Sequence, residues 1–206
     1  MKKSLLLFSA LLVLLFDAGA QKLEITAFTG YSFNSQANTY YGRYKVDNSQ
    51  NYGGLIGVYI SPGMMAEFLY NRTDTRVQYV YTGSPNPLDV GIEYYQLGGV
   101  QHFDIGSPAL IPFGAVSLGA TRFVLQDAGG DFTQTGDYWS FSAAIGGGLK
   151  IFPAEKIGFR LQARLGMPMS FNGIFFGIGT GGVSSGASFR VPIVMFDLSA
   201  GIILRL

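Results

Sequence analysis

The segment 156–167, KIGFRLQARLGM, alternates strictly between apolar side chains and polar or small ones. A period of two is typical of a β-strand whose two faces meet different environments. A helix is disfavoured, because its apolar residues would recur three and four positions apart and each glycine would cost about 1 kcal/mol. The segments 138–151 and 194–206 repeat the alternation. The pattern therefore predicts long strands with two different faces.

The remaining strands and their connections predict how the sheet closes. Weaker alternation covers 23–33, 52–60 and 65–73, while 90–103 and 111–125 read as strands whose phase is less clear. The connections at 61–63, 104–109 and 153–155 are short, and those at 34–51, 74–89, 126–137 and 166–190 are long. Long and short connections alternate strictly, as in an up-and-down barrel whose long loops share one end. We therefore predict an all-β fold, an eight-stranded antiparallel up-and-down β-barrel.

The first twenty residues differ from the rest of the chain. Lys2 and Lys3 precede an apolar run at 5–16, which the small residues Ala18, Gly19 and Ala20 follow. This order is typical of a secretory signal peptide, and the run is too short for a helix that spans a bilayer, which needs about 20 residues. We expect residues 1–20 to be a cleaved signal peptide and residues 21–206 to form one barrel domain.

The scarcity of charge indicates which face of the barrel points outward. Charged residues make up 13% of the chain, about half of the usual 25%. In the clear strands the polar face is mostly Gly, Ser and Thr, whereas the water-facing wall of a soluble barrel carries many more charges. Turning the strand 157–166 over would place Arg160 and Arg164 in lipid, at about 2–4 kcal/mol each. We therefore expect a transmembrane barrel with the apolar face in lipid and the polar face inside.

The chain also resembles a known group of proteins. The signal peptide, the eight two-faced strands and the segments KIGFRLQARLGM and FDLSAGIILRL are similar to the small outer-membrane β-barrel proteins of Gram-negative bacteria. This group includes OmpX, the transmembrane domain of OmpA and related barrel domains common in Bacteroidetes. The resemblance implies the outer membrane as location, with long extracellular loops and both termini in the periplasm. It also implies contact with the lipid bilayer and lipopolysaccharide, and assembly by the barrel-assembly machinery with periplasmic chaperones.

The polar face of the clear strands supplies candidates for a network in the barrel lumen. An eight-stranded barrel is just wide enough inside for side chains to fill it. We therefore expect a structural network of hydrogen bonds and ion pairs, and a gated polar pathway is the alternative. The candidates are Glu24, Glu67, Arg160, Gln162, Arg164, Asp197 and Arg205, and Lys150 shares their face.

Aromatic residues fall into two predicted groups. A cluster of exposed apolar residues in a loop indicates binding or burial, so Phe171, Phe175, Phe176 and Phe189 are candidates for contact with the barrel mouth or the membrane. The alternative is that their loop forms an extra hairpin and makes a ten-stranded barrel. Tyr and Trp concentrate where a membrane meets water. The candidates for this interfacial girdle are Tyr52, Tyr70, Trp139, Phe141 and Phe152.

The sequence offers few candidate residues for catalysis or metal binding. The chain has one histidine, His102, and no cysteine, so no nucleophile and base pair or metal site can be assembled from those residues. Asp127 and Asp131 lie in a Gly-rich loop without the ligand pattern of an EF-hand, so we expect a solvated turn there. A formal net charge of +1 disfavours a nucleic-acid partner. We expect no enzyme activity and no cofactor.

The expected role is that of an integral outer-membrane protein whose lumen is filled by side chains and whose long loops contact the outside. A structural or surface-interaction function is the leading hypothesis. The alternatives are transport of small apolar compounds, which a similarity to OmpW-like barrels would imply, and a narrow pore. Eight strands leave no open aqueous channel, which disfavours a porin.

Overall fold

The computed structural model describes residues 23–34, 36–39, 42–80, 87–125, 137–179, 182–190 and 194–206. The predicted signal peptide, residues 1–20, lies outside these ranges, as do Asp127 and Asp131. Among the described residues no helix is long and apolar enough to cross a membrane.

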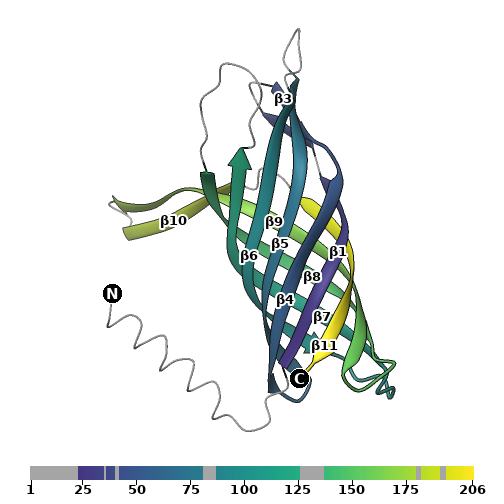
Figure 1. Cartoon of the computed structure of the whole chain (residues 1–206). Coiled ribbons are helices and arrows are strands. Elements are labelled where there is room, and N and C mark those ends of the chain that lie inside the picture. The colour runs from purple at the N-terminus through teal and green to yellow at the C-terminus, as the bar shows by residue number, and fades with distance from the viewer. Residues whose placement is uncertain are drawn as a thin grey trace, which may run out of the picture.

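Eight antiparallel strands close into a barrel (Figure 1). Each wall strand pairs with the next one along the chain, and the first pairs with the last, so that Glu24 lies opposite Arg205. Closure leaves no open edge along the wall, which satisfies the backbone hydrogen bonds as a membrane requires. The predicted eight-stranded barrel is confirmed. Its strands are β1 (Leu23–Asn34), β4 (Ser49–Ser61), β5 (Met64–Val80), β6 (Pro87–His102), β7 (Leu110–Leu125), β8 (Asp137–Ile151), β9 (Ile157–Gly179) and β11 (Met195–Arg205).

The two ends of the barrel differ. One end, called the turn end below, holds the short connections at 62–63, 103–109 and 152–156 together with Leu23 and Leu206. Gly63 adopts a φ of 82°, which a side chain would disfavour, so it fits the tight turn between β4 and β5. Leu206 donates a backbone hydrogen bond to Leu23, at 2.8 Å. The opposite end, called the loop end, holds the long connections.

The long connections contain more strand than the sequence indicated. Strand β5 continues to Val80, where it pairs with β3 (Gly42–Val46), which in turn pairs with β2 (Gln36–Thr39). Strand β9 continues to Gly179 and forms a hairpin with β10 (Gly182–Arg190). The predicted loop boundaries at 74 and 166 were therefore wrong, because pairing between neighbouring strands continues beyond the barrel wall.

The extra hairpin does not enlarge the barrel. Among the described strands β10 pairs only with β9, while β11 pairs with the lower part of β9 and closes the wall. The ten-stranded alternative was therefore wrong. In the hairpin Phe175 lies opposite Gly186, Phe176 opposite Ser185, and Phe171 opposite Phe189. The side chains of these four phenylalanines, predicted to contact the mouth or the membrane, lie outside what the structure describes.

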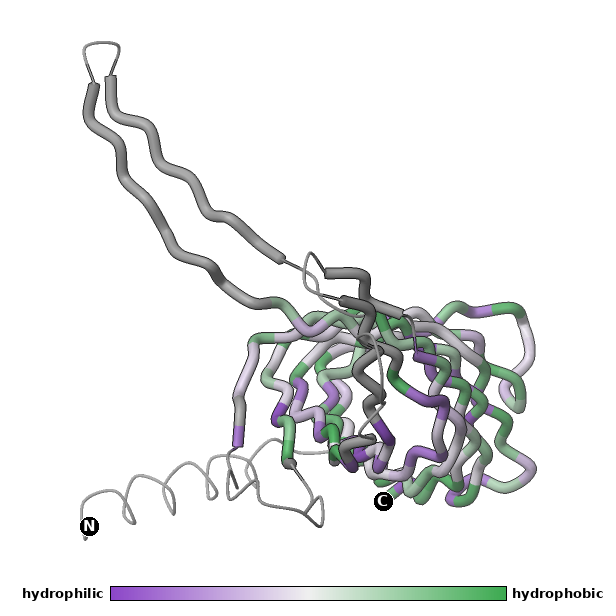
Figure 2. Tube along the Cα trace, turned by 90° about the horizontal axis from the view of Figure 1, so that it is seen from above, coloured by the Kyte–Doolittle hydropathy of each residue, from purple (hydrophilic) through white to green (hydrophobic). Residues whose placement is uncertain are grey.

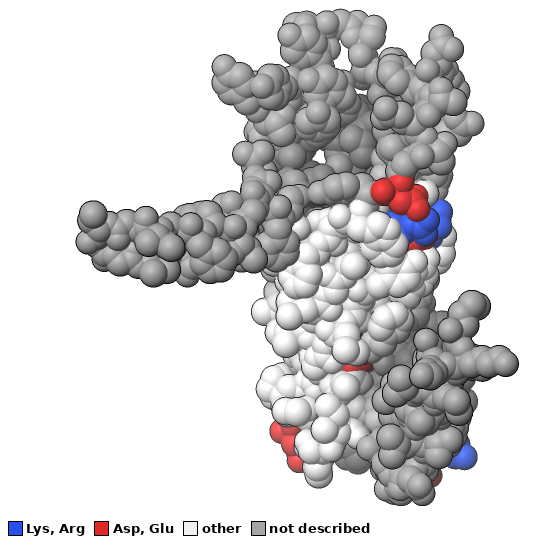
Figure 3. All heavy atoms as spheres, turned by 90° about the vertical axis from the view of Figure 1, so that its left-hand side faces the viewer, with Lys and Arg blue, Asp and Glu red and all other residues white. Residues whose placement is uncertain are grey.

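Hydrophobic and hydrophilic residues alternate along the strands (Figure 2), and their burial separates an apolar outer wall from a polar interior. On β9, Phe159, Leu161 and Leu165 are exposed on the outside, whereas Arg160 and Arg164 are buried inside. The face of the wall seen in Figure 3 is almost free of charge between its two ends, and charged side chains gather at its loop-end edge. The predicted orientation, with the polar face inside, agrees with this burial.

Strand β6 explains why its phase was hard to read from the sequence. Its inner face begins with Val90, Ile92 and Tyr94, which are buried together with Leu55 and Leu69 in an apolar cluster. Its outer face carries Glu93, which is also buried. Apolar residues inside and a charge outside invert the usual pattern locally, so simple alternation gives no clear phase there.

We expect Leu161→Arg to destabilise the barrel by about 2–4 kcal/mol, because the new charge would enter the lipid near the middle of the wall. Leu161 is 48% exposed on the outer face. The measurement is urea unfolding of the protein in phospholipid vesicles. Glu155→Arg, in an exposed turn, is the matched control and should change stability little. Equal losses in the two variants would contradict the assigned outer face.

Candidate functional site

Glu24 on β1 holds the first group of charges inside the barrel, near the turn end. Its carboxylate accepts a hydrogen bond from Lys150 Nζ at 2.5 Å and another from Arg205 Nη2 at 2.8 Å. The Tyr59 hydroxyl donates a third, at 2.7 Å. Strands β1, β4, β8 and β11 thus meet at one buried carboxylate. Because β1 and β11 form the closing seam, the Glu24–Arg205 pair joins the two strands across it.

Glu67 on β5 and Arg160 on β9 form the second group. The guanidinium donates from Nη1 to Oε2 at 2.5 Å and from Nη2 to Oε1 at 3.0 Å, so the pair is bidentate. Arg160 Nε donates to Gln162 Oε1 at 2.7 Å. Both charged side chains are buried. Bidentate geometry fixes both partners in orientation and is stronger than a single hydrogen bond.

Asp197 on β11 is the centre of the third group, which lies further toward the loop end. Arg164 Nη2 donates to its Oδ2 at 2.7 Å, and the Ser32 hydroxyl donates to its Oδ1 at 2.5 Å. Asn71 Nδ2 lies 3.4 Å from Oδ2. Asn51 Nδ2 donates in turn to Ser32 Oγ at 2.9 Å. The carboxylate is therefore satisfied by several donors although it is buried.

Aromatic rings lie close to the positively charged side chains that point into the barrel. The Arg160 guanidinium lies 4.4 Å from the ring centre of Phe113, and Lys150 Nζ lies 5.8 Å from the same ring. Arg164 lies 5.4 Å from the Tyr94 ring, and Arg205 lies 3.8 Å from the Phe152 ring. A ring face attracts a cation, and more strongly where water is excluded. The rings thus fill space and stabilise the charges at the same time.

Little free space remains around these groups. A cavity lined by Glu67, Gln162 and Arg164 measures about 20 Å³, room for about one water molecule. Four cations and three carboxylates form the ion pairs inside the described part of the barrel. Their charges nearly cancel, and nearly all their polar atoms are paired. Such an interior fills the lumen with paired side chains at the level of these three groups.

The sequence candidates for the lumen meet in these three groups. All seven of them, from Glu24 to Arg205, point inward and make the contacts given above. Sequence reasoning did not find Tyr59, Gln96 or Ser142 as partners. Gln96 donates to Ser142 at 3.3 Å and lies 3.5 Å from Arg164 Nη1. Its place on the inner face of β6 was hidden by the unclear phase of that strand.

Four of the five aromatics predicted for the interface lie on the outer face. Tyr52, Trp139 and Phe141 are exposed there, and Tyr70 is half-buried against Tyr95, with ring centres 5.2 Å apart. Phe152 was placed wrongly, since it is only 7% exposed and packs under Arg205. Strict alternation from Lys150 already puts Phe152 on the inner face, and the turn that follows folds it over the lumen.

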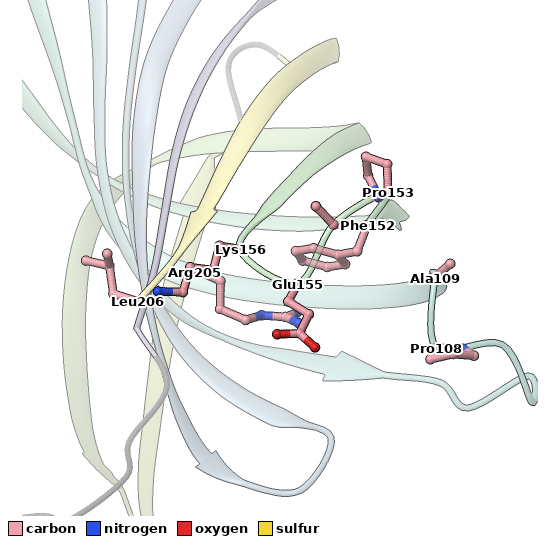
Figure 4. A pocket seen from close by; sticks show the side chains of 9 residues that line it. Pro108, Ala109, Phe152, Pro153, Glu155, Lys156, Arg205 and Leu206 are labelled. Carbon is pink, nitrogen blue, oxygen red and sulfur yellow. The ribbon is translucent and has the colours of Figure 1, made fainter.

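A depression opens at the turn end between the 103–109 and 152–156 connections (Figure 4). Its volume is about 710 Å³. Phe152, Glu155 and Arg205 line it, with the Arg205 guanidinium beside the Phe152 ring. Arg205 also pairs with the buried Glu24, so the depression adjoins the Glu24 group. Among the described residues no group of three or more His, Asp or Glu side chains is placed to hold a metal ion.

Comparisons with known proteins agree on the fold. No family model matches the sequence, and no curated protein matches it. Neisserial surface protein A is similar in structure with a TM-score of 0.61 and 14% identity, covering 89% of this chain and 97% of that one. The outer membrane protein OprG from Pseudomonas aeruginosa gives 0.58 and 13% identity, covering 90% and 96%.

The chain thus has the fold of the small eight-stranded outer-membrane barrels, and the resemblance seen in the sequence is confirmed at that level. Its outer wall is apolar and its backbone is paired in a closed ring, which are the two properties that a lipid environment demands. Together they suit a barrel whose wall is surrounded by lipid.

We expect Arg160→Met to destabilise the barrel by about 3–5 kcal/mol, because Glu67 would remain buried without a partner. The double variant Glu67→Gln, Arg160→Met should lose less than the sum of the two single variants. The measurement is equilibrium unfolding in detergent micelles. Arg76→Met is the matched control, since its pair with Asp89 is 55% and 51% exposed, and exposed pairs contribute little. Strict additivity of the two buried changes would contradict coupling between them.

Proposed function

We propose that this protein is a non-conducting outer-membrane barrel with a structural or surface-interaction role. The observation that carries the proposal is the filled interior, in which the Glu24, Glu67 and Asp197 carboxylates are all paired with cations. Moving an ion along the lumen would require breaking buried pairs, each of which is expensive to separate. An interior of this kind suits a rigid support that presents its loop end to the surroundings.

The proposal includes how the chain is exported, oriented and inserted into the membrane. Residues 1–20 direct export and are removed, and residues 21–206 form the barrel domain. The turn end, with Leu23 and Leu206, faces the periplasm, and the loop end faces outside. Periplasmic chaperones and the barrel-assembly machinery insert the chain, and lipopolysaccharide surrounds the loop end. The short turns and long connections at opposite ends support this orientation. We expect no enzyme activity, no cofactor and no nucleic-acid partner.

Transport of small apolar compounds is a second candidate, and one observation favours it. The lumen near the loop end is lined by an apolar cluster of Leu55, Leu69, Val90, Ile92, Tyr94 and Met195. An apolar solute entering there would find compatible surroundings. The Arg164–Asp197 pair lies beside this cluster, with Arg164 5.4 Å from the Tyr94 ring, so we infer that a solute would have to leave sideways through the wall.

We expect no steady ion conductance when the purified protein is reconstituted in planar lipid bilayers. The variant Glu67→Ala, Arg160→Ala removes the bulk of the central pair and should conduct measurably, which shows that the assay detects an opened lumen. Uptake of an apolar solute into vesicles is measured on the same preparation. Steady conductance by the unaltered protein would overturn the proposal in favour of a narrow pore. Solute uptake without conductance would overturn it in favour of apolar transport.

A further inference from the structure

His102 is the last residue of β6 and lies on the inner face of the barrel, at the turn end. It is directly opposite Phe113 in the strand register, and directly opposite residues share a face of the sheet. Its backbone amide donates a hydrogen bond to Gly63 O at 2.7 Å. Gln101 Nε2 donates to its carbonyl oxygen at 3.0 Å. The backbone is therefore held firmly where the ring enters the lumen.

The imidazole ring of His102 packs on Tyr59, with ring centres 5.4 Å apart and ring planes inclined by 30°. The hydroxyl of the same tyrosine donates to Glu24 Oε1 at 2.7 Å and lies 3.4 Å from Arg205 Nη2. Glu24 and Arg205 face each other across the seam between β1 and β11. His102 therefore supports a side chain that helps to hold the seam closed.

One ring nitrogen of His102, Nε2, is buried and has no hydrogen-bond partner among the described residues. A neutral imidazole carries one donor and one acceptor, whereas an imidazolium is a donor at both nitrogens. Protonation in this position would therefore bury an N–H that has no acceptor and would add a positive charge to it. A buried charged donor without a partner costs far more than a neutral one. The packing is thus suited to the neutral ring.

The charges around the ring oppose its protonation as well. Three cations and two carboxylates surround it: Lys150 on β8, Arg160 on β9, Arg205 on β11, Glu24 on β1 and Glu67 on β5, which is paired with Arg160. The Glu24 carboxylate already accepts three hydrogen bonds. Asp104, two residues after His102, lies in the exposed turn and accepts a hydrogen bond from the Gly106 amide at 2.8 Å. A positive ring would therefore meet more repulsion than attraction.

His102 lies at the edge of the membrane-spanning part of β6, where protons from water can reach it. A membrane strand crosses the hydrocarbon with about 9–11 residues. Glu93, nine residues before His102 on the same strand, pairs with Arg72 and Arg122, so one edge of the hydrocarbon lies near Glu93. The other edge then falls near His102, and the connection at 103–109 begins directly after it.

The balance of these effects can be written as a pH dependence. Burial in the first place, and then the nearby Lys150, lower the pKa of His102 to about 4. In the unfolded chain the ordinary pKa of about 6.5 applies. Because the folded value is the lower one, the stability that the neutral ring contributes is complete above about pH 6.5. It is lost as the pH falls from about 6.5 toward 4.

We propose that His102 is an acid-sensitive switch at the turn end of the barrel. While it is neutral, its ring packs on Tyr59 and keeps the tyrosine hydroxyl on Glu24. A protonated ring leaves this position for water, and the contacts that Tyr59 makes with Glu24 and Arg205 loosen. Acid therefore weakens the barrel where its first and last strands meet. The switch needs no ligand and works whichever end of the barrel faces outside.

The first test follows the ring itself. The chain has one histidine, so proton NMR of the untagged mature chain in detergent micelles reports its imidazole signal without assignment. We expect a titration midpoint near pH 4 in the folded barrel and near 6.5 in urea. The matched control, Gln101→His with His102→Gln, moves the histidine to the exposed position beside it and should titrate near 6.5. A midpoint near 6.5 in the unaltered folded barrel would overturn the inference.

The second test follows the seam. Between pH 7.5 and pH 5 the unfolding equilibrium constant in urea should rise roughly tenfold or more through this one group, and much less in His102→Gln, whose side chain does not titrate. Carboxylates titrate in both proteins, so the difference isolates His102. Hydrogen exchange at pH 4 should show lost protection along β1 and β11 near Glu24 and Arg205, in the unaltered protein only. Equal pH dependence in both proteins, or loss of protection elsewhere, would overturn the switch. The NMR titration needs no variant and decides the matter if His102→Gln does not refold.

Discussion

Pairing of every backbone amide in a medium without water is the requirement on which the rest of this structure depends. Hydrocarbon offers no hydrogen bonds, so the strands must satisfy one another and the sheet must close, here through β1 and β11. Closure with eight strands then sets a narrow lumen. One residue in two faces lipid and must be apolar, and its neighbour must fit inside. The low charge content and the strict alternation of β9 both follow from this geometry.

The interior of this barrel is packed differently from the apolar core of a soluble protein. Because the apolar residues are needed outside, the inside cannot be packed with them alone, and three buried carboxylates hold it together instead. Buried charges are tolerable only when they are paired and hydrogen-bonded. Lys150 and Arg160 meet this condition through Glu24, Glu67 and the ring of Phe113. An apolar cluster around Tyr94 lies inside the barrel beside the Arg164–Asp197 pair.

The sequence predicted the strands best where the two faces differ most, as on β9 and β11. It predicted poorly where that contrast fails, as on β6, whose inner Ile92 and outer Glu93 reverse the rule. The lumen residues were identified by face, but their pairing was not. Glu24 and Lys150 are 126 residues apart and meet only because of strand tilt and stagger, which alternation does not specify. The sequence also predicted that the strand of β9 ends at 166. The strand continues because it pairs with β10, and composition alone does not indicate that pairing.

The seam between β1 and β11 also governs the order in which this chain can fold. Glu24 and Arg205 are 181 residues apart, so their contact has nearly the longest loop that the chain can close, and such contacts form slowly. Until β11 arrives, one edge of β1 stays open and is available to other strands, which invites aggregation. Folding therefore depends on something that shields this edge while the last strand is delivered. The Glu24–Arg205 ion pair across the seam forms only when β1 and β11 have paired, and it then stabilises the closed barrel.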